Sequence, residues 1–450
     1  MPERSMSERS MSEEPQRHAE AGRLAVVTPW YPSLNRPFAG SFVRTMTAAV
    51  ADRFGSVGLY HPEDWRRPDD PAEAELAGRA FARLAGPATG RVPVEPRTTA
   101  EGWELTRVPA VIRTKRNYAD WGRTHEEALR AVLPGGVIDA DVVHGHVGTY
   151  GGWCAVRLAR PGARVVVTEH AAFLDRVLDQ PAALAMYDEV LERAHVFLCV
   201  GDALRRQIAG YLPHHAEKLR VLPNAVDFDA RAMREEPFDG RLRRLLYVGA
   251  LNERKGTAKL LRAFAALLAE DPELTLTLVG PEDAPGEAAR LAGELGVAGR
   301  VELLPPVPPQ AVPGLLHRHD LLVHPSSWET FGMTVIEAVA AGTPVLATRC
   351  GGPEETLAGL EGTAGELIEV DEDPRVIADG YRRLRARSES GGLDLAEARS
   401  RLAARYGLPA VGAALAGVYG LDEPPAGEPA PRIGAPEPAA GSVVGAGARQ

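Results

Sequence analysis

Residues 320–348, DLLVHPSSWETFGMTVIEAVAAGTPVLAT, predict a strand, a loop, a helix and a second strand in one continuous stretch. The apolar run DLLVH predicts a buried strand that ends at His324, and the segment from about 331 to 341 has the apolar spacing of a helix. The run PVLAT at 344 predicts a strand that returns to the same sheet. This order of elements is typical of a parallel sheet covered by helices.

Similar short apolar runs, rich in β-branched residues, recur along the rest of the chain. They are LAVVT at 24, VGLY at 57, DVVHGH at 141, RVVVT at 164, HVFLCV at 195, LRVLPN at 219, LLYVG at 245, LTLTLVG at 274, RVELL at 300 and ELIEV at 366. About a dozen strands are too many for one doubly wound sheet. We therefore predict an α/β protein with two Rossmann-like, doubly wound parallel-sheet domains that face each other across a cleft.

The Pro- and Gly-containing segment 227–240 is the predicted division between the two domains. The predicted parts are an N-terminal domain over 23–226, a C-terminal domain over 227–403 and a last helix over 404–421. In doubly wound sheets, ligands bind at the carboxyl ends of the strands. We therefore expect the functional residues in the loops that follow the strands.

Three further segments are not expected to contribute to the core. Residues 1–22 are a polar near-repeat without the apolar centre of a signal peptide, and residues 422–450 are rich in Pro, Ala and Gly. Both are predicted to be disordered tails, because such sequences bury little apolar surface. The Pro-rich stretch 66–97 predicts a long loop with at most a short helix at 73–84.

Composition limits the possible partners of the 450-residue chain. It carries 51 Lys and Arg against 61 Asp and Glu, a formal net charge of −10, which disfavours nucleic acid as the main partner. The three cysteines, Cys154, Cys199 and Cys350, are far apart in the sequence, so neither a disulfide framework nor a zinc site is indicated. Cysteines in this arrangement favour the reducing cytosol, so we expect a cytoplasmic protein. No apolar run reaches the roughly 20 residues of a membrane span, so we also expect it to be soluble.

Several common catalytic motifs are missing from the sequence. No GxGxxG follows the first strand, and GxxxxGK[ST], GxSxG and HExxH do not occur, which disfavours dinucleotide oxidoreductases, P-loop enzymes, α/β hydrolases and zincins. Three DxD triplets, at 139–141, 227–229 and 371–373, leave a metal-dependent transferase open. Asp is also common in turns and caps, so we interpret these triplets as structural.

The loop before the helix at about 331 has the features of a nucleotide site. Thr330 is a possible N-cap, and the N–H groups of Phe331, Gly332 and Met333 would then form an anion site at the helix N-terminus. Glu337, on the second turn, is a carboxylate suited to a pair of neighbouring hydroxyls such as those of ribose. An anion followed by a ribose indicates a nucleotide.

A second strand, loop and helix, LLYVGALNERKGTAKLL, begins at 245. Arg254 and Lys255 lie just ahead of its helix, where the macrodipole is unfavourable for cations. A bound diphosphate would compensate these charges, whereas two solvated loop charges are the simpler interpretation. We expect that replacing Lys255 leaves the stability of the empty protein unchanged or slightly improved.

The stretch HPSSWETFGMTVIEAVAAGTPVLAT resembles the donor-site signature of the retaining family 4 glycosyltransferases of the GT-B fold, with Glu329 and Glu337 as its E-x7-E pair. Other resembling segments are VGALNERKG at 248, LPNAVD at 222, GGPEE at 351, TPWYPSLNRPFAGSFV at 28, DVVHGH at 141, VVTEH at 166 and RSRLAARYGLPAVGAALAGVY at 399. The resemblance covers about 23–420 and is more specific in the second half. The last segment resembles the family's final helix, which crosses back to the N-terminal domain.

The resemblance implies a role for each matching residue. Arg254 and Lys255 would hold the donor diphosphate, Glu337 the ribose and Glu329 hydroxyls of the transferred sugar. His170 would contact the sugar or the reacting centre, although a His at a strand end is more often structural. The other implied contacts to donor or acceptor are Gly249, Thr330, Phe331, Gly332 and Met333 in the donor site and Gly40 with Ser41 in the N-terminal loop.

Three departures from the family pattern affect the donor site. Ala250 stands where the family often has Arg, and Ala39 precedes Gly40 where many members have paired glycines. Pro305 and Pro306 follow RVELL in place of the usual Gly, and both lack an N–H donor near the expected base pocket. The sequence therefore does not identify the nucleotide base.

The implied reaction is retaining and needs neither cofactor nor metal, because fixed cations and a helix N-terminus stabilise the leaving diphosphate. The acceptor hydroxyl would attack from the leaving-group side, while double displacement through Glu329 is the alternative mechanism. We expect a hexosyl-type transfer to a small polar metabolite. A cell-surface glycan or lipid-linked acceptor is the alternative.

Functions of other classes remain open. A nucleotide-sugar epimerase, a phosphorylase or a non-catalytic nucleotide-sugar binding protein would keep a similar donor site. Peripheral membrane contact is less favoured, and its one candidate is VIRTKRNYADWGR at 111, with Arg113, Lys115, Arg116 and Trp121.

Overall fold

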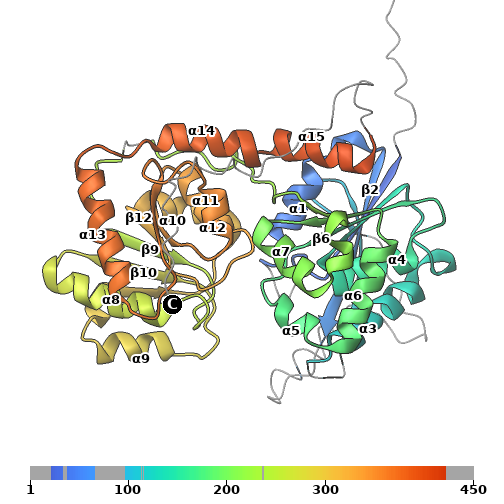
Figure 1. The fold of residues 1–450 in the computed structure, drawn as a ribbon, viewed down its shortest axis with the longest axis horizontal. Helices are drawn as coiled ribbons and strands as arrows, with labels where there is room; N and C mark the ends of the chain where they lie inside the picture. Colours follow the sequence, from blue (N-terminus) through green and yellow to red (C-terminus); the bar gives the residue numbers. More distant parts are fainter. Residues whose placement is uncertain are drawn as a thin grey trace, which may run out of the picture.

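The computed structural model describes residues 22–33, 38–65, 75, 97–112, 114, 116–235 and 238–421 (Figure 1). The tail predicted at 422–450 lies outside these residues, as do the tail predicted at 1–22, except Gly22, and the loop and helix predicted between 66 and 97, except Glu75 and Arg97. Figure 1 shows two lobes side by side, with helices α14 and α15 running one after the other along both.

The first lobe contains an eight-stranded sheet in the order β3-β4-β2-β1-β5-β6-β7-β8. Its strands are β1 (Arg23–Val27), β2 (Ser56–Trp65), β3 (Arg97–Thr98), β4 (Glu104–Val111), β5 (Val142–His146), β6 (Arg164–Glu169), β7 (Val196–Cys199) and β8 (Leu219–Val221). Its α-helices are α1 (Ser41–Ala48), α3 (Tyr118–Val132), α4 (Trp153–Leu158), α5 (Leu174–Leu178), α6 (Pro181–Arg193) and α7 (Asp202–Tyr211). All neighbouring strands are parallel except β3 and β4.

The second lobe contains a six-stranded parallel sheet in the order β11-β10-β9-β12-β13-β14. Its strands are β9 (Arg244–Val248), β10 (Thr275–Val279), β11 (Val301–Leu304), β12 (Leu321–His324), β13 (Val345–Thr348) and β14 (Gly365–Ile368). Its helices are α8 (Thr257–Glu270), α9 (Glu287–Glu294), α10 (Val312–Arg318), α11 (Met333–Ala340), α12 (Gly352–Thr356), α13 (Arg375–Glu389) and α14 (Leu395–Tyr406), and the chain then returns to the first lobe as α15 (Leu408–Tyr419). The prediction of two doubly wound parallel sheets is confirmed.

All twelve predicted strands are present, while β3 and β4 were not predicted. β4 carries charged residues and Pro109, which are unusual in a central strand. Pro109 is tolerated because β4 pairs with β2 on one side only, and the short β3 covers only Glu104 and Leu105 on the other side. Pro109 therefore lies where the strand edge needs no N–H donor.

The strands are buried on both faces, which explains their continuous apolar sequences. In β1, Leu24 and Val26 belong to one core cluster, while Ala25 and Val27 belong to another on the opposite face. All four side chains are fully or almost fully buried. The same strand thus contributes to two helical layers, and its carboxyl end opens towards the second lobe.

Helix α15 joins the end of the chain to the first lobe. Its Tyr419 hydroxyl lies 2.7 Å from Nδ1 of His144 in β5, and Nε of Arg164 donates to the carbonyl of Val418 at 2.7 Å. Gly412 faces α1, where an added Cβ would lie 2.2 Å from the carbonyl oxygen of Ala49. The helix therefore packs closely against the first lobe at a position where no side chain fits.

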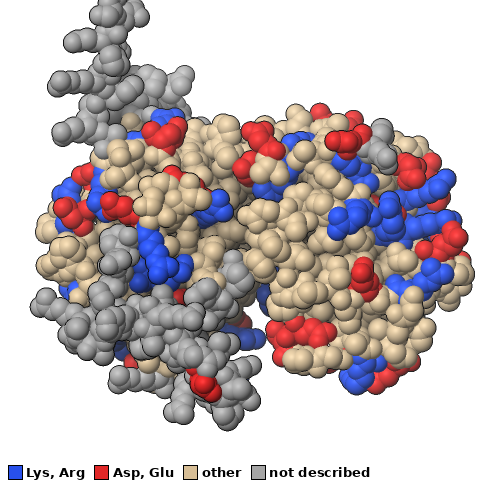
Figure 2. Space-filling view, turned by 180° about the vertical axis from the view of Figure 1, so that it is seen from behind, with Lys and Arg blue, Asp and Glu red and all other residues tan. Residues whose placement is uncertain are grey.

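The surface shows no segregation of charge on the face drawn in Figure 2, where acidic and basic side chains are intermixed over both lobes. Within the described residues, no helix combines the length and apolar character that a membrane crossing requires. Trp121 of the candidate membrane segment is buried, and its Nε1 donates to the carbonyl of Thr114 at 2.9 Å. Arg113 and Lys115 lie outside the described residues.

Replacing Gly412 by Val should destabilise the protein, because the new side chain must separate α15 from α1. Overpacking of this kind costs about 1–3 kcal/mol, which lowers the Tm by several degrees. Gly417→Val is the matched control, since an added Cβ on the same helix meets no atom within 4 Å there. Equal melting temperatures for the two variants, measured by calorimetry, would contradict the close packing of α15.

Candidate active site

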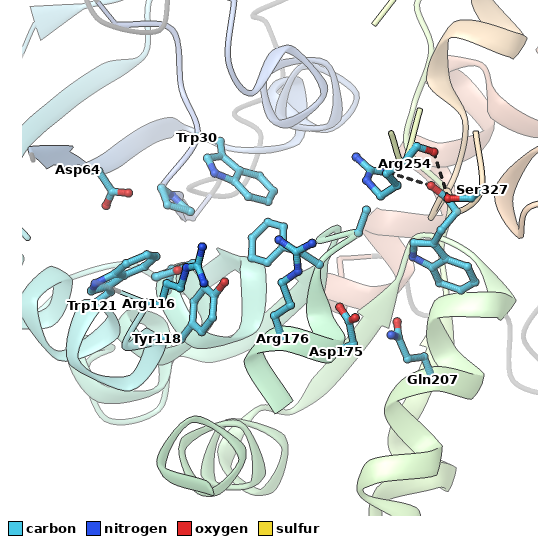
Figure 3. A pocket seen from close by; sticks show the side chains of 15 residues that line it. Trp30, Asp64, Arg116, Tyr118, Trp121, Asp175, Arg176, Gln207, Arg254 and Ser327 are labelled. Carbon is cyan, nitrogen blue, oxygen red and sulfur yellow. Dashed lines mark hydrogen bonds between the residues drawn. The ribbon is translucent and has the colours of Figure 1, made fainter. Parts of the chain in front are cut away.

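A cavity of about 850 Å³ lies between the two lobes (Figure 3). Residues that follow the ends of β1 and β6, such as Trp30 and Phe173, line it from the first lobe. Arg254, Ser327 and Trp328, which follow the ends of β9 and β12, line it from the second. The cavity thus lies at the carboxyl ends of both sheets, where parallel α/β folds bind their ligands.

Helix α11 begins two residues later than predicted. Gly332 is its N-cap, with φ 80° and ψ 51°, a left-handed conformation that glycine adopts at little cost. Phe331 precedes the helix and is buried, with its ring edge-on to Tyr406 at 5.5 Å between centroids. Met333 is the first helical residue, so the first-turn N–H groups begin there rather than at Phe331.

The prediction that Thr330 caps α11 is wrong. Its hydroxyl instead donates to the carbonyl of His170 in the first lobe, at 3.1 Å. The reason is local geometry: the turn through Gly332 separates Thr330 from the first helical turn and directs it across the cleft. Thr330 is therefore a contact between the two lobes.

The carboxylate of Glu329 is almost fully buried and gathers the cations of the predicted donor site. Its Oε1 accepts from Nζ of Lys255 and lies 3.3 Å from Nε2 of His324 and 4.0 Å from Nη1 of Arg254. Burial alone would raise the pKa of Glu329, but the hydrogen bond from His324 and the charge of Lys255 hold that pKa well below its usual range. The structure thus brings Arg254, Lys255 and Glu329 together.

Lys255 is not an uncompensated cation. It lies beside Gly256, the left-handed N-cap of α8, and its ammonium group is paired with Glu329. The expectation that replacing Lys255 leaves the stability of the empty protein unchanged assumed that the helix dipole is the main charge acting on Lys255. That assumption is wrong, because Glu329 is paired with Lys255. A buried carboxylate that loses its partner is costly.

Glu337, on α11, forms an ion pair that the sequence analysis did not predict. Nη2 of Arg231 donates to its Oε1 at 2.6 Å, and both side chains are mostly buried. Arg231 belongs to the 227–240 connector, and its Nη1 also donates to the carbonyl of Asp227 at 3.0 Å. Burial raises the pKa of Glu337, while the nearby Arg231 charge opposes that rise. The one feature of the sequence that could have indicated this ion pair is the basic residue Arg231 in the connector.

His170 follows β6 and is buried. Its Nε2 shares a hydrogen bond with Nδ1 of His146 at 2.8 Å, and its ring lies 4.6 Å from that of Phe42. Burial lowers the pKa of His170 to about 3, so its ring is neutral near pH 7. Glu169 fixes this segment, because its Oε1 accepts from the N–H groups of His170 and Ala171, both at 2.8 Å.

Two predicted glycines lie where an added Cβ would meet a neighbouring atom closely. Gly40 is the N-cap of α1 at φ 69°, and a Cβ there would lie 1.9 Å from the carbonyl oxygen of Trp30. Ser41 is the first residue of that helix. Gly249 follows β9, and a Cβ there would lie 2.8 Å from the Tyr247 hydroxyl. Gly40 and Ser41 thus hold the N-terminus of α1 next to Trp30.

The three DxD triplets make structural contacts. Asp141 accepts from the N–H of Arg23 at 2.7 Å, and Asp227 Oδ1 accepts from the N–H of Ala230 at 2.9 Å. Asp371 Oδ1 accepts from the N–H of Asp373 at 2.8 Å. These contacts agree with the interpretation of the triplets as turn and cap residues.

Replacing Lys255 by Met should destabilise the protein at pH 7 by about 1–3 kcal/mol, because Glu329 loses its closest partner. Folding lowers the pKa of Glu329, so this stabilisation is present above about pH 4.3 and is lost as the pH falls below it. Denaturant unfolding of the parent protein, Lys255→Met, Glu329→Gln and the double variant, at pH 7 and below about pH 4.3, would measure the coupling free energy between Lys255 and Glu329. An unchanged unfolding free energy for Lys255→Met at pH 7 would refute it.

Two family models match the chain along most of its length. Residues 39–230 match Glycosyltransferase Family 4, and residues 229–400 match Glycosyl transferases group 1. A D-inositol 3-phosphate glycosyltransferase from Nocardioides sp. is 32% identical over 290 residues, which are 57% of this chain and 62% of that relative. The chain thus spans about three fifths of the length of this curated relative.

Solved structures share the fold. Sucrose-phosphate synthase from Thermosynechococcus elongatus superposes with a TM-score of 0.66 at 19% identity, over 89% of this chain and 98% of that one. Anabaena HepE, solved in complex with UDP and glucose, gives a TM-score of 0.60 at 16% identity, over 90% and 100% of the two chains. With two facing parallel-sheet domains and matches to both family models, the chain belongs to the family 4 glycosyltransferases of the GT-B fold.

Proposed function

We propose that the protein is a retaining glycosyltransferase that moves a sugar from a nucleotide-diphosphate sugar to a hydroxyl of a small polar acceptor. The observation that carries this proposal is the cluster of Arg254, Lys255 and Glu329 at the carboxyl ends of β9 and β12. Glu337 lies on the helix that starts beside this cluster. The arrangement supplies cations for a diphosphate and two carboxylates for hydroxyl groups.

The proposed donor follows from this charge arrangement. Arg254 and Lys255 would bind the diphosphate, and Glu337 would accept hydrogen bonds from the ribose. Lys255 has three N–H donors, so one can stay with Glu329 while another reaches a phosphate oxygen. HepE, which shares the fold, was solved with UDP and glucose, in keeping with a nucleotide-sugar donor.

The proposed acceptor is small and polar. The curated relative is named for D-inositol 3-phosphate, and one structural neighbour is a sucrose-phosphate synthase. Both names support a hydroxylated metabolite rather than a polymer. The cavity wall of the first lobe, which carries Trp30 and Phe173, is the proposed binding surface for this acceptor.

In the proposed reaction, breaking the bond between the sugar and the diphosphate builds negative charge on the leaving group. Arg254 and Lys255 stabilise this charge most in the transition state, so no metal ion is required. The acceptor hydroxyl attacks from the leaving-group side and passes its proton to a phosphate oxygen. Glu329 is engaged by Lys255 and His324, which favours a hydrogen-bonding role for it over that of a covalent nucleophile.

The decisive experiment incubates the protein with UDP-, GDP-, ADP- and dTDP-sugars and follows release of the nucleoside diphosphate. A mass search of small-molecule extracts for a product heavier by one sugar then identifies the acceptor. Release that depends on an acceptor supports the proposal. Interconversion of the donor sugar without any acceptor, or binding without turnover, would overturn it in favour of an epimerase or a binding protein.

Replacing Glu337 by Ala should raise the donor KM about tenfold or more, because a charge-assisted hydrogen bond contributes about 1.5–3 kcal/mol. Because Arg231 loses its partner in this variant, some loss of stability is expected, and circular dichroism under the assay conditions is the control for an intact fold. A donor KM equal to that of the parent protein would remove Glu337 from the donor site.

Replacing Arg231 by Met should move the acid limb of the donor kcat/KM profile to higher pH. Without the Arg231 charge the pKa of Glu337 rises further, so the carboxylate that binds ribose is lost at a higher pH. Profiles from about pH 5 to about pH 9 measure the shift. Arg231→Lys keeps the charge and should leave the limb near its original position; the same displacement in both variants would contradict a charge effect.

Activity should survive EDTA, since protein cations supply the charge stabilisation. Turnover is measured before and after chelation and dialysis. Complete loss that Mn²⁺ or Mg²⁺ restores would instead assign a metal ion to the reaction.

A further inference from the structure

Two histidines and an aspartate meet at the surface of the first lobe. Asp188 of α6 faces His214 and His215, which belong to the short 3₁₀ helix η4 (Pro213–Lys218) that follows α7. Among the residues that the structure describes, these three are the one group whose potential metal-ligand atoms all lie within 4.8 Å of one another. None of them lines the cavity between the lobes, and the proposed reaction does not use them.

The two imidazole rings converge on a single oxygen atom. Nε2 of His214 and Nε2 of His215 each lie 2.8 Å from Oδ1 of Asp188, and the two ring centroids are 4.3 Å apart. With a proton on each Nε2, both rings donate to this carboxylate. With the protons on Nδ1 instead, two nitrogen lone pairs and a carboxylate oxygen face the same point. That is the ligand arrangement of a cation site.

The spacing suits a transition-metal ion such as Zn²⁺. Zn²⁺ binds imidazole nitrogen and carboxylate oxygen at about 2.0–2.2 Å, so tetrahedral ligand atoms lie about 3.4 Å apart. Each distance from Oδ1 to Nε2 must therefore open by about half an ångström. Asp188 and His214 can make this adjustment, because their side chains are 43% and 60% exposed, whereas His215, at 14%, is held more firmly. The exposed side leaves the fourth position to water.

Hydrogen bonds on both sides of the cluster hold the two ligand-bearing segments together. The hydroxyl of Tyr211, at the end of α7, donates to Oδ1 of Asp179, just before α6, at 2.7 Å. Nζ of Lys218, at the end of η4, donates to the carbonyl of Glu192, near the end of α6, at 2.7 Å. The three ligands thus lie on segments whose spacing is already fixed, so a metal ion would find them largely in place.

We propose that Asp188, His214 and His215 form a structural binding site for Zn²⁺ or a similar divalent transition-metal ion, which joins α6 to η4. Imidazole favours such ions over Mg²⁺ and Ca²⁺, which prefer sets of oxygen ligands. The chain continues from η4 directly into β8, the last strand in the order of the first sheet. The ion would therefore fasten the part of the first lobe from which the chain leaves for the second.

This site is separate from the proposed chemistry. Its ligands lie outside both the cavity lining and the donor cluster, so the ion takes no part in the transfer and the inference does not depend on the proposed function. The spacing of the cysteines did not indicate a zinc site, and this cluster contains no cysteine. All three cysteines are buried, so none of them offers Zn²⁺ an accessible thiol.

The test is a calorimetric titration of the untagged protein with ZnCl₂, after dialysis against EDTA and its removal. We expect a saturable site for one Zn²⁺ per chain. Binding should be at least about tenfold weaker in His214→Gln, His215→Gln and Asp188→Asn, since even the loss of a residue that only supports a ligand costs that much. His317→Gln is the matched control, because His317 is a partly exposed histidine outside the cluster, and it should bind Zn²⁺ as the parent does.

A second measurement separates metal binding from the loss of a hydrogen bond. An ion that binds only the folded protein stabilises it, so saturating Zn²⁺ should raise the Tm of the parent and of His317→Gln by several degrees. His214→Gln should show no such rise; His214 is the most exposed of the three ligands, so this replacement disturbs the fold least. Mg²⁺ at the same concentration should leave every Tm unchanged.

Equal Zn²⁺ affinity in the parent and in all three cluster variants would assign the ion to other residues and overturn the inference. A parent protein that shows neither heat of Zn²⁺ binding nor a rise in Tm would overturn it as well. A rise in Tm of the same size in His214→Gln and in the parent would contradict the role of His214 as a ligand.

Discussion

The site depends on one buried charge. Glu329 lies in the loop after β12, and its carboxylate is stabilised only because Lys255, Arg254 and His324 surround it. Removing a carboxylate from water costs several kcal/mol unless it is paired and hydrogen-bonded. The loops after β9 and β12 must therefore come together as the sheet forms. The parallel order of these two adjacent strands places both loops at the same edge, so the fold itself assembles the cluster.

The two lobes meet through contacts of the same loops. Thr330, the residue after Glu329, donates to the carbonyl of His170, which ends the segment held by Glu169. Glu355 of α12 accepts from the N–H groups of Asp202 and Ala203, each at 2.7 Å, at the N-terminus of α7. A carboxylate of one lobe thus caps a helix of the other, where the macrodipole favours negative charge. Together with the contact of α15 with β5, these hydrogen bonds join the two lobes on either side of the cavity.

The sequence predicted the elements well because parallel strands are buried on both faces and leave continuous apolar runs. It failed where the deciding contact joins distant residues. Lys255 and Glu329 are 74 positions apart, and Arg231 and Glu337 are 106 apart, so neither pair leaves a local pattern. The cap of α11 was assigned to Thr330 from residue type, while the conformation of Gly332 decides it. The cavity wall of the first lobe was not predicted, since its residues, such as Trp30 and Phe173, are dispersed over several loops that only the fold brings together.

The pairing of Lys255 with Glu329 also bears on how the proposed reaction gains rate. An empty site with two free cations would bind a diphosphate strongly in the ground state, which lowers KM without raising kcat. Here Lys255 is shared with Glu329 before the donor arrives, so part of its charge is already neutralised. In the proposed mechanism, charge would grow on the leaving group as the glycosidic bond breaks, and Lys255 would interact with it more strongly. Another N–H of Lys255 would stay on Glu329, so in this proposal the pair would stabilise the transition state more than the bound donor.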